Sequence, residues 1–180
     1  MSAARTDLRR LNTADRAVFV AVCGPLFEGS PWVAERAWAR GPFATIDELH
    51  AALMGVVAAS TDEEKLALVA AHPDLVGRLA RQGAVSDLSK TEQTAAGLDV
   101  LSADEIARFE SYNAAYREKF GFPFVICARQ NRKEAILAAF PVRLAHTREE
   151  EIAAALVEVG KIARLRLVDA VAEGEKNAAV

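Results

Sequence analysis

The sequence predicts an all-α, single-domain bundle of about eight helices with one short extended buried segment. Three observations support this fold class: helix-start signals recur along the chain, the last helical stretch has an apolar face, and a proline interrupts the one strand-like run. The chain has 180 residues, of which 52% are hydrophobic and 26% are charged. A chain of this length and composition can bury a sizeable core within one domain.

Two helices are expected near the N-terminus. The first spans residues 13–23 and is stopped by Gly24 and Pro25, and a short second helix follows Ser30. No repeat, low-complexity tract or long linker divides the chain, so residues 13–172 are expected to form the helical domain. The segments on either side are expected to be flexible at the N-terminus and frayed at the C-terminus: residues 1–12 and residues 173–180.

Six segments carry the spacing of a capping box, in which Ser, Thr or Asn is followed three residues later by Glu. Such a pair satisfies two main-chain N–H groups, and each pair therefore predicts the start of a helix. The pairs are Thr45 with Glu48, Ser60 with Glu63, Ser89 with Glu92, Ser102 with Glu105, Asn131 with Glu134, and Thr147 with Glu150.

Residues 120–128 are the one strand-like run, because they are rich in aromatic and β-branched side chains. Pro123 interrupts this run and lacks the N–H group that a sheet ladder requires. We therefore expect an extended buried segment here.

The last helix is expected over residues 147–172, where five apolar side chains return to one face at about 100° per residue: Ile152, Leu156, Val159, Ile162 and Ala163. Arg166 lies on the same face, whereas Lys161 and Arg164 point away from it. A buried guanidinium needs an anion. The partner of this guanidinium is either a carboxylate of this chain in an ion pair, or a carboxylate or ureido group of a substrate.

Charge and composition exclude several classes of function. The net charge is −3 with both signs mixed along the chain, which argues against nucleic acid as a partner. No apolar run approaches the roughly 20 residues that span a membrane, and no signal-peptide core is seen, so a cytoplasmic location is expected.

Cys23 and Cys127 match no metal spacing and fit a reducing compartment, and His50 and His146 form no ligand pattern. No metal is expected, and phosphate-binding loops and hydrolase motifs are absent from the sequence.

His72 and Glu92 have ordinary structural interpretations when each is taken alone. His72 precedes Pro73, which disfavours helical geometry before it, so this imidazole projects from a helix end, as surface and capping histidines do. Glu92 can be the carboxylate of a capping box. With Ser89 and Gln93 it would also surround a helix N-terminus, where a small anionic substrate could dock.

Four segments, taken in order and spacing, resemble the family of 2-oxo-4-hydroxy-4-carboxy-5-ureidoimidazoline (OHCU) decarboxylases. They are Phe27-Glu28-Gly29-Ser30-Pro31-Trp32, Ala71-His72-Pro73-Asp74-Leu75, Ser89-Lys90-Thr91-Glu92-Gln93 with Ala96-Gly97-Leu98, and Phe120-Gly121-Phe122-Pro123-Phe124-Val125. A fifth segment, residues 161–167, is similar to the closing helix of the family. The resemblance covers roughly residues 13–172.

The resemblance implies an all-α enzyme, usually a homodimer, that converts OHCU to (S)-allantoin in purine breakdown without metal or organic cofactor. It implies that His72 is the catalytic histidine and Glu92 its acidic companion. The residues that it places around the substrate are Pro73, Ser89, Gln93, Phe122, Val125, Ile126 and Arg166. One departure is His146, where the family often carries Asn. Arg143 is also similar to the family, and both a structural ion pair and a substrate contact remain open for it.

The substrate that this family uses carries its own electron sink, a ring C=N bond beside the carbon that bears the carboxylate. We expect neutral His72 to accept a hydroxyl proton while Glu92 orients or charges it. The sequence is also compatible with two other functions. One is a cofactor-independent lyase or isomerase acting on another ureide, and the other is a noncatalytic helical module that binds a partner through residues 120–124 and Arg166.

Overall fold

The computed structural model describes residues 5–76 and 86–173. These residues are predominantly helical: they form nine α-helices, three short 3₁₀ turns and one pair of two-residue strands, so the predicted all-α class is confirmed. The chain divides into two compact units, which are described separately. Unit 1 comprises residues 1–62 and 160–180, and unit 2 comprises residues 63–159. Within the described ranges, no helix is long and apolar enough to cross a membrane.

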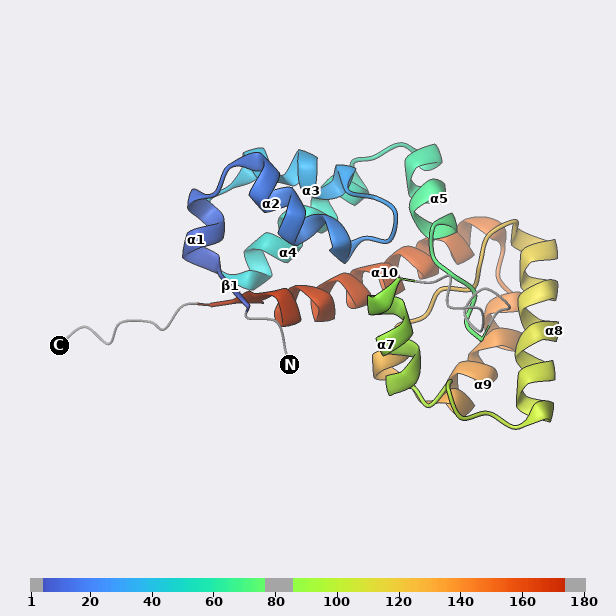
Figure 1. Ribbon diagram of the computed structural model, residues 1–180. Helices are drawn as coiled ribbons and strands as arrows, with labels where there is room; N and C mark the ends of the chain where they lie inside the picture. The colour runs from blue at the N-terminus through green and yellow to red at the C-terminus, as the bar shows by residue number, and fades with distance from the viewer. Residues whose placement is uncertain (1–4, 77–85, 174–180) are drawn as a thin grey trace. The chain divides into compact units, whose positions relative to one another are not determined.

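Unit 1 contains the elements from both ends of the chain (Figure 1). They are β1 (Thr6–Asp7), α1 (Leu8–Thr13), α2 (Arg16–Cys23), η1 (Gly24–Leu26), α3 (Trp32–Ala37), η2 (Trp38–Arg40), α4 (Ile46–Ala58), the C-terminal half of α10 (Arg148–Ala170) and β2 (Val171–Ala172). The two short strands are parallel, with Thr6 opposite Val171 and Asp7 opposite Ala172.

The N-terminal helices differ from the sequence prediction at their start and agree with it at their end. Helix α1 and strand β1 lie within the segment predicted to be flexible, and Leu8 and Leu11 of α1 are buried. Helix α2 begins only after Asp15, whose carboxylate accepts a hydrogen bond from the Val18 N–H at 2.8 Å. It ends at Cys23, as the following Gly-Pro pair predicts. Residues 1–4 and 174–180, which include most of the predicted frayed tail, lie outside the described residues.

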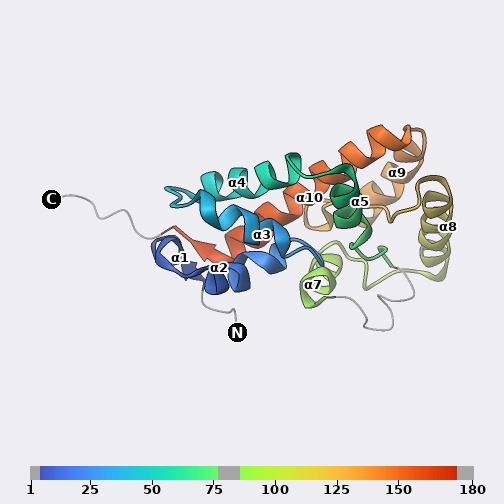
Figure 2. The same ribbon diagram turned by 90° about the horizontal axis from the view of Figure 1, so that it is seen from above.

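Helix α4 runs alongside the C-terminal half of α10 (Figure 2). The close approach is possible because α10 carries Gly160, where a Cβ atom would lie only 3.2 Å from Cε of Met54. The imidazole of His50 donates from Nε2 to the Gly160 carbonyl at 2.9 Å. His50 therefore has a structural role in unit 1.

The described residues of unit 2 form four helices and the first half of a fifth. They are α5 (Asp62–Ala70), α7 (Asp87–Ala95), α8 (Ala103–Phe120), α9 (Lys133–Leu144) and the N-terminal half of α10, with the turn η3 (Ala128–Gln130) before α9. Helices α8 and α9 pack against each other. Helix α8 begins with a complete capping box between Ser102 and Glu105 and ends at Gly121, which adopts a left-handed φ of 81°.

The core of unit 2 is aromatic, and the extended segment between α8 and η3 supplies much of it. The prediction of a buried extended segment is confirmed, because residues 121–127 form neither helix nor strand and Phe122 and Phe124 are almost fully buried. Tyr116 of α8 contacts both rings edge to face, and Phe124 stacks on Phe140 of α9 with 4.0 Å between ring centroids.

The predicted helix caps have mixed outcomes. Thr45, Ser102 and Thr147 each accept a hydrogen bond from the N–H of the glutamate three residues later, as predicted. The cap predicted at Asn131 is wrong, because α9 begins at Lys133 and the Asn131 amide instead donates to the Cys127 carbonyl at 3.0 Å. The Ser60 hydroxyl donates back to Val57 at the end of α4, and α5 begins at Asp62.

Candidate active site

His72 lies two residues beyond the last residue of α5, close to the helix end that Pro73 predicts. Its side chain is buried, with an exposed fraction of 6%, so it is not a surface histidine. Nδ1 lies 2.9 Å from the main-chain oxygen of Leu68. A carbonyl oxygen can only accept, so Nδ1 carries the hydrogen of this bond. In the neutral ring the lone pair is then on Nε2, which is the nitrogen that can accept a proton.

Helix α8 holds the segment that follows His72 in two places. The Arg117 Nε donates to both carboxylate oxygens of Asp74, at 2.9 and 3.0 Å. The buried Asn113 amide donates to the Leu75 carbonyl at 2.8 Å. Since this stretch has no regular secondary structure, the Asn113 amide supplies the Leu75 carbonyl with a donor that a helix or strand would otherwise provide, whereas Arg117 fixes the stretch through the Asp74 side chain.

Val76 has a left-handed backbone with φ of 57°, which is rare for a β-branched residue and costs about 1–3 kcal/mol. Its N–H donates to Oε1 of Gln93 at 3.2 Å. This bond joins the segment after His72 to helix α7, which carries Ser89, Glu92 and Gln93. The structure thus brings two predicted parts of the site together within unit 2.

The predicted cap at Ser89 is wrong, and the correction changes how α7 presents its side chains. Helix α7 begins at Asp87, and the Ser86 hydroxyl accepts from the Ser89 N–H at 3.2 Å. A second serine three residues upstream offers the same capping chemistry and starts the helix one turn earlier. Ser89, Glu92 and Gln93 therefore have i, i+3 and i+4 spacing on one helix face. Ser89 is buried and the other two are half-buried.

The extended segment supplies the third predicted part of the site, and η3 directly after it packs against α7. Phe122 and Val125 are buried in the core of unit 2, whereas Ile126 is partly exposed. Among the three residues of this segment that the family resemblance places at the substrate, Ile126 is therefore the one whose side chain is not buried. The Cys127 N–H donates to Oε2 of Glu158 at 2.8 Å, which fixes the end of the segment against α10.

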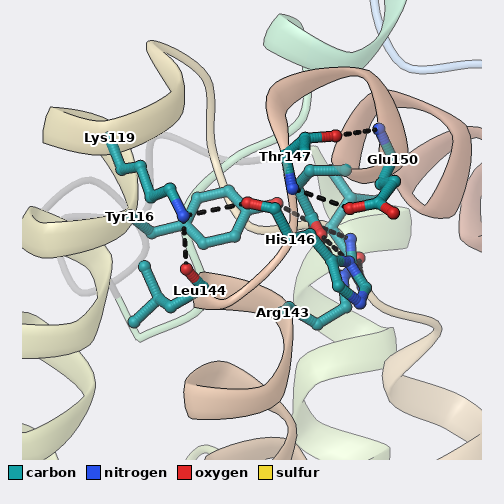
Figure 3. Close-up of polar contacts among 9 residues, drawn as sticks. Tyr116, Lys119, Arg143, Leu144, His146, Thr147 and Glu150 are labelled. Atoms are coloured by element: carbon teal, nitrogen blue, oxygen red, sulfur yellow. Dashed lines mark hydrogen bonds and ion pairs between the residues drawn. The ribbon is translucent and has the colours of Figure 1, made fainter.

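A buried polar cluster that the sequence did not predict lies at the start of α10. It consists of Glu151 with Tyr116, Arg143 and His146, all within unit 2. Figure 3 labels Tyr116, Arg143 and His146 of this cluster, beside the capping box that Thr147 and Glu150 form. Burial, and then the hydrogen bond to Glu151, raises the pKa of Tyr116 well above its usual range, so this phenol stays protonated and donates.

Arg166 belongs to unit 1, and the prediction that it is buried is confirmed by its exposed fraction of 3%. Its Nη1 lies 3.2 Å from Oε2 of Glu28 and 3.4 Å from the Pro25 carbonyl. Of the two kinds of partner that the sequence allows, the structure shows the carboxylate of this chain. A contact between Arg166 and a substrate remains a prediction.

The arrangement in unit 2 offers an imidazole whose Nδ1 is bound to the Leu68 carbonyl, and a hydroxyl, a carboxylate and an amide on one helix face. These groups can move protons and bind a small polar ring. Within the part of the chain that the structure describes, no group of three or more His, Cys, Asp or Glu residues is placed to hold a metal ion.

Comparison with known proteins gives consistent matches. A family model described as OHCU decarboxylase matches residues 12–168. The proteins named 2-oxo-4-hydroxy-4-carboxy-5-ureidoimidazoline decarboxylase from Haloferax volcanii and Amia calva are each 41% identical to this chain. The first match covers 90% of this chain and 94% of its relative, and the second covers 91% and 93%.

A crystal structure described as (S)-allantoin synthase is similar with a TM-score of 0.74 and 32% identity. That match covers 93% of this chain and 54% of the other, so this chain spans about half of it.

Proposed function

Because the chain belongs to the OHCU decarboxylase family, we propose that it converts OHCU to (S)-allantoin without a cofactor, with His72 and Glu92 as its catalytic residues. The family match and the named relatives support a carboxy-lyase that acts on OHCU and yields allantoin in urate degradation. The proposal goes beyond these matches in three respects: the (S) configuration of the product, the independence from cofactors and the roles of individual residues.

The observation that carries the residue assignment is the hydrogen bond between Nδ1 of His72 and the Leu68 carbonyl. This bond orients the buried ring and leaves Nε2 as the basic nitrogen of the neutral form. A general base needs a defined orientation and a lone pair directed at the proton that it removes. His72 meets the first requirement through the main chain of its own helix.

The substrate makes a cofactor unnecessary. When the bond to the carboxylate breaks, CO2 leaves and the bonding electron pair forms a C=C bond to the neighbouring ring carbon. The π electrons of the ring C=N bond move to its nitrogen, which takes up a proton. The product of this step is an enol. Its hydroxyl then loses a proton while the neighbouring carbon gains one on a single face, which gives allantoin. The protein has to position the ring, stabilise charge and transfer protons.

In this mechanism Nε2 of His72 takes the hydroxyl proton, and Glu92 orients the imidazole or stabilises its charged form. Ser89 and Gln93 share the helix face of Glu92 and bind polar groups of the ring. Pro73, the main chain of residues 122–126 and Ile126 complete the contacts within unit 2.

The direct experiment generates OHCU in situ from urate and follows the circular dichroism of (S)-allantoin. We expect His72→Ala and Glu92→Ala to lower the rate by about 100- to 10,000-fold, the usual contribution of positioned acid–base groups. Glu118→Ala removes an exposed carboxylate of α8 and serves as the control, with an unchanged rate. Undiminished stereospecific production by His72→Ala would exclude this mechanism, and loss of activity on treatment with a chelator would exclude cofactor independence.

A cytoplasmic homodimer is the proposed form of the protein. Its two cysteines, Cys23 and Cys127, are both buried, which fits a protein made in a reducing compartment. Light scattering after gel filtration should give twice the chain mass of 19.4 kDa. A particle of one chain mass at micromolar concentration would contradict the dimer.

A further inference from the structure

The carboxylate of Glu151 is the most deeply buried charged group among the described residues, with no exposed surface. It lies in the first turn of α10 and accepts hydrogen bonds from three sides. The donors are the Tyr116 hydroxyl, Nε of Arg143 at 2.6 Å and Nδ1 of His146 at 2.8 Å. The Nη2 atom of Arg143 also faces the same carboxylate oxygen as Nε. Glu151 is therefore the centre of this cluster.

The Arg143 guanidinium connects this cluster to the extended segment. While Nε donates to Glu151, Nη1 donates to the Val125 carbonyl at 2.9 Å, and the group lies 4.8 Å from the centre of the Phe124 ring. The planar fork of arginine makes both bonds at once, which a lysine ammonium at the same place cannot do. The carboxylate thus fixes the guanidinium, and the guanidinium fixes the main chain at Val125.

Other contacts keep the base of the cluster in place. Nζ of Lys119 donates to the main-chain oxygens of Leu144 and His146, at 2.6 and 2.9 Å (Figure 3). The capping box of Thr147 and Glu150 fixes the first turn of α10 directly before Glu151. The loop between α9 and α10 is therefore held on both sides of His146.

Within residues 5–76 and 86–173, no strand pairs with the main chain of the extended segment, so the segment depends on such side chains. A buried carbonyl group needs a donor, and at Val125 that donor is Arg143. A buried ion pair gives no clear gain in stability over well-packed apolar side chains. The cluster is therefore better explained by its effect on the position of the extended segment than by a contribution to stability.

We propose that Arg143 and Glu151 are positioning residues that fix the main chain at Val125, and with it the substrate-contacting surface of residues 122–126. This inference rests on the proposed function, which places those residues at the substrate. Arg143 acts through the backbone and is not itself a catalytic residue.

The test compares three variants with the wild type. Arg143→Lys keeps a charge beside Glu151 and loses the second bond to Val125. The double variant Arg143→Met/Glu151→Leu removes both charges together, so that neither is left buried alone and the chain can fold. His146→Asn is the matched control, because it changes a partner of Glu151 that does not touch the segment.

Two measurements separate positioning from a merely structural role. Hydrogen exchange of the peptide covering residues 121–128 reports the mobility of the segment directly. Steady-state kinetics with OHCU separates KM from kcat, because partial unfolding lowers the active fraction and hence kcat while KM stays constant. We expect faster exchange and a kcat/KM lowered by about 10- to 100-fold, mostly through KM, in the two Arg143 variants and not in His146→Asn.

Unchanged exchange and unchanged KM in folded Arg143 variants would overturn the inference. Faster exchange with an unchanged KM would also overturn it, since the segment would then move without affecting substrate binding. Both results leave the reaction of the wild type intact. A wild type that makes no allantoin would overturn the proposed function and the inference with it, and the exchange data would still show whether Arg143 fixes the segment.

Discussion

The Val76 N–H donates to Oε1 of Gln93 across 3.2 Å, which joins the segment behind His72 to the helix that carries Glu92. Val76 accepts an uncommon left-handed backbone to make this bond. Strained residues persist where the surrounding structure determines them, and here α7 and α8 both hold the segment. The distance between the proposed base and its acidic companion therefore depends on Gln93.

Replacing Gln93 with Leu should lower both stability and activity. The Val76 N–H would lose its acceptor, which costs about 1–3 kcal/mol in the free energy of unfolding. The turnover of OHCU should fall as His72 shifts relative to α7. Urea unfolding and the circular dichroism assay measure the two effects. Gln93→Glu keeps an oxygen at the same position, and identical behaviour of the Leu and Glu variants would refute this role.

Arg166 and Arg164 lie two residues apart on α10 and should differ sharply in their contribution to stability. Arg166→Met removes the cation that pairs with the mostly buried Glu28, and breaking such a pair costs about 3–5 kcal/mol. Arg164→Met breaks an exposed pair with Asp47, which contributes only about 0–1 kcal/mol. Urea midpoints compare the two variants. Equal midpoints would show that Arg166 has no structural role and would favour a contact with substrate.

Tyr116 should make the folded state sensitive to alkaline pH. Burial raises the pKa of its phenol above the unfolded value of 10, and the bond to Glu151 adds to the shift. Its contribution to stability is thus complete below about pH 10 and is lost as the pH rises toward the folded pKa.

The variant Tyr116→Phe isolates this effect. At about pH 8 it should be less stable than the wild type by about 1–3 kcal/mol, because Glu151 loses a buried donor. The difference in the free energy of unfolding should shrink between about pH 10 and pH 11. Over this range the wild type loses the stability that its protonated phenol contributes, whereas the variant has no phenol at this position to titrate. Urea unfolding of both proteins at about pH 8 and pH 11 measures this difference. A difference that grows with pH would contradict the raised pKa of Tyr116.

The Cys23 thiol should be unreactive in the folded protein. Burial raises its pKa to about 12, so almost no thiolate exists at neutral pH, and the thiolate is the reactive form. In a Cys127→Ala variant, which leaves Cys23 as the one thiol, DTNB should label the protein only after denaturation in urea. Labelling of the native variant within minutes at pH 8 would show that Cys23 becomes exposed.

Local signals in the sequence predicted helix ends well where a single residue type decides them. The Gly-Pro pair after Cys23 ends α2, and Ser102 with Glu105 begins α8. The start of α7 was mispredicted because Ser86 and Ser89 offer the same hydroxyl one turn apart. Choosing between two such caps depends on the packing of the whole helix, which local spacing does not contain.

The buried face of α10 was predicted with a shift of one residue in its N-terminal half. Ile152 and Leu156 are half-buried, whereas Glu151 and Ala155 are fully buried. Glu151, Ala155 and Val159 recur at i+4 spacing, so helical periodicity could have found the buried carboxylate. Hydrophobicity alone favoured Ile152, because an acidic residue in the first turn of a helix is usually solvated.

Much of the candidate site came from the resemblance to a family, since spacing along the chain does not show which loops meet. The bond between Val76 and Gln93 bridges 17 positions, and Asn113 reaches Leu75 over 38. Such contacts depend on how helices pack, and the sequence of either partner alone does not reveal them. Burial of Arg166 was predictable because it follows from one helix face.

Unit 1 is assembled from two stretches of chain, with all of unit 2 between them. On the ribosome, unit 2 is therefore complete before Gly160 emerges to receive α4 and before Val171 can pair with Thr6. The nascent N-terminal helices have to wait for their last partner while unit 2 is already able to fold. Pulse-labelled chains should accordingly become resistant to protease first between residues 63 and 159, and at the N-terminus only later, once residues 160–172 are available.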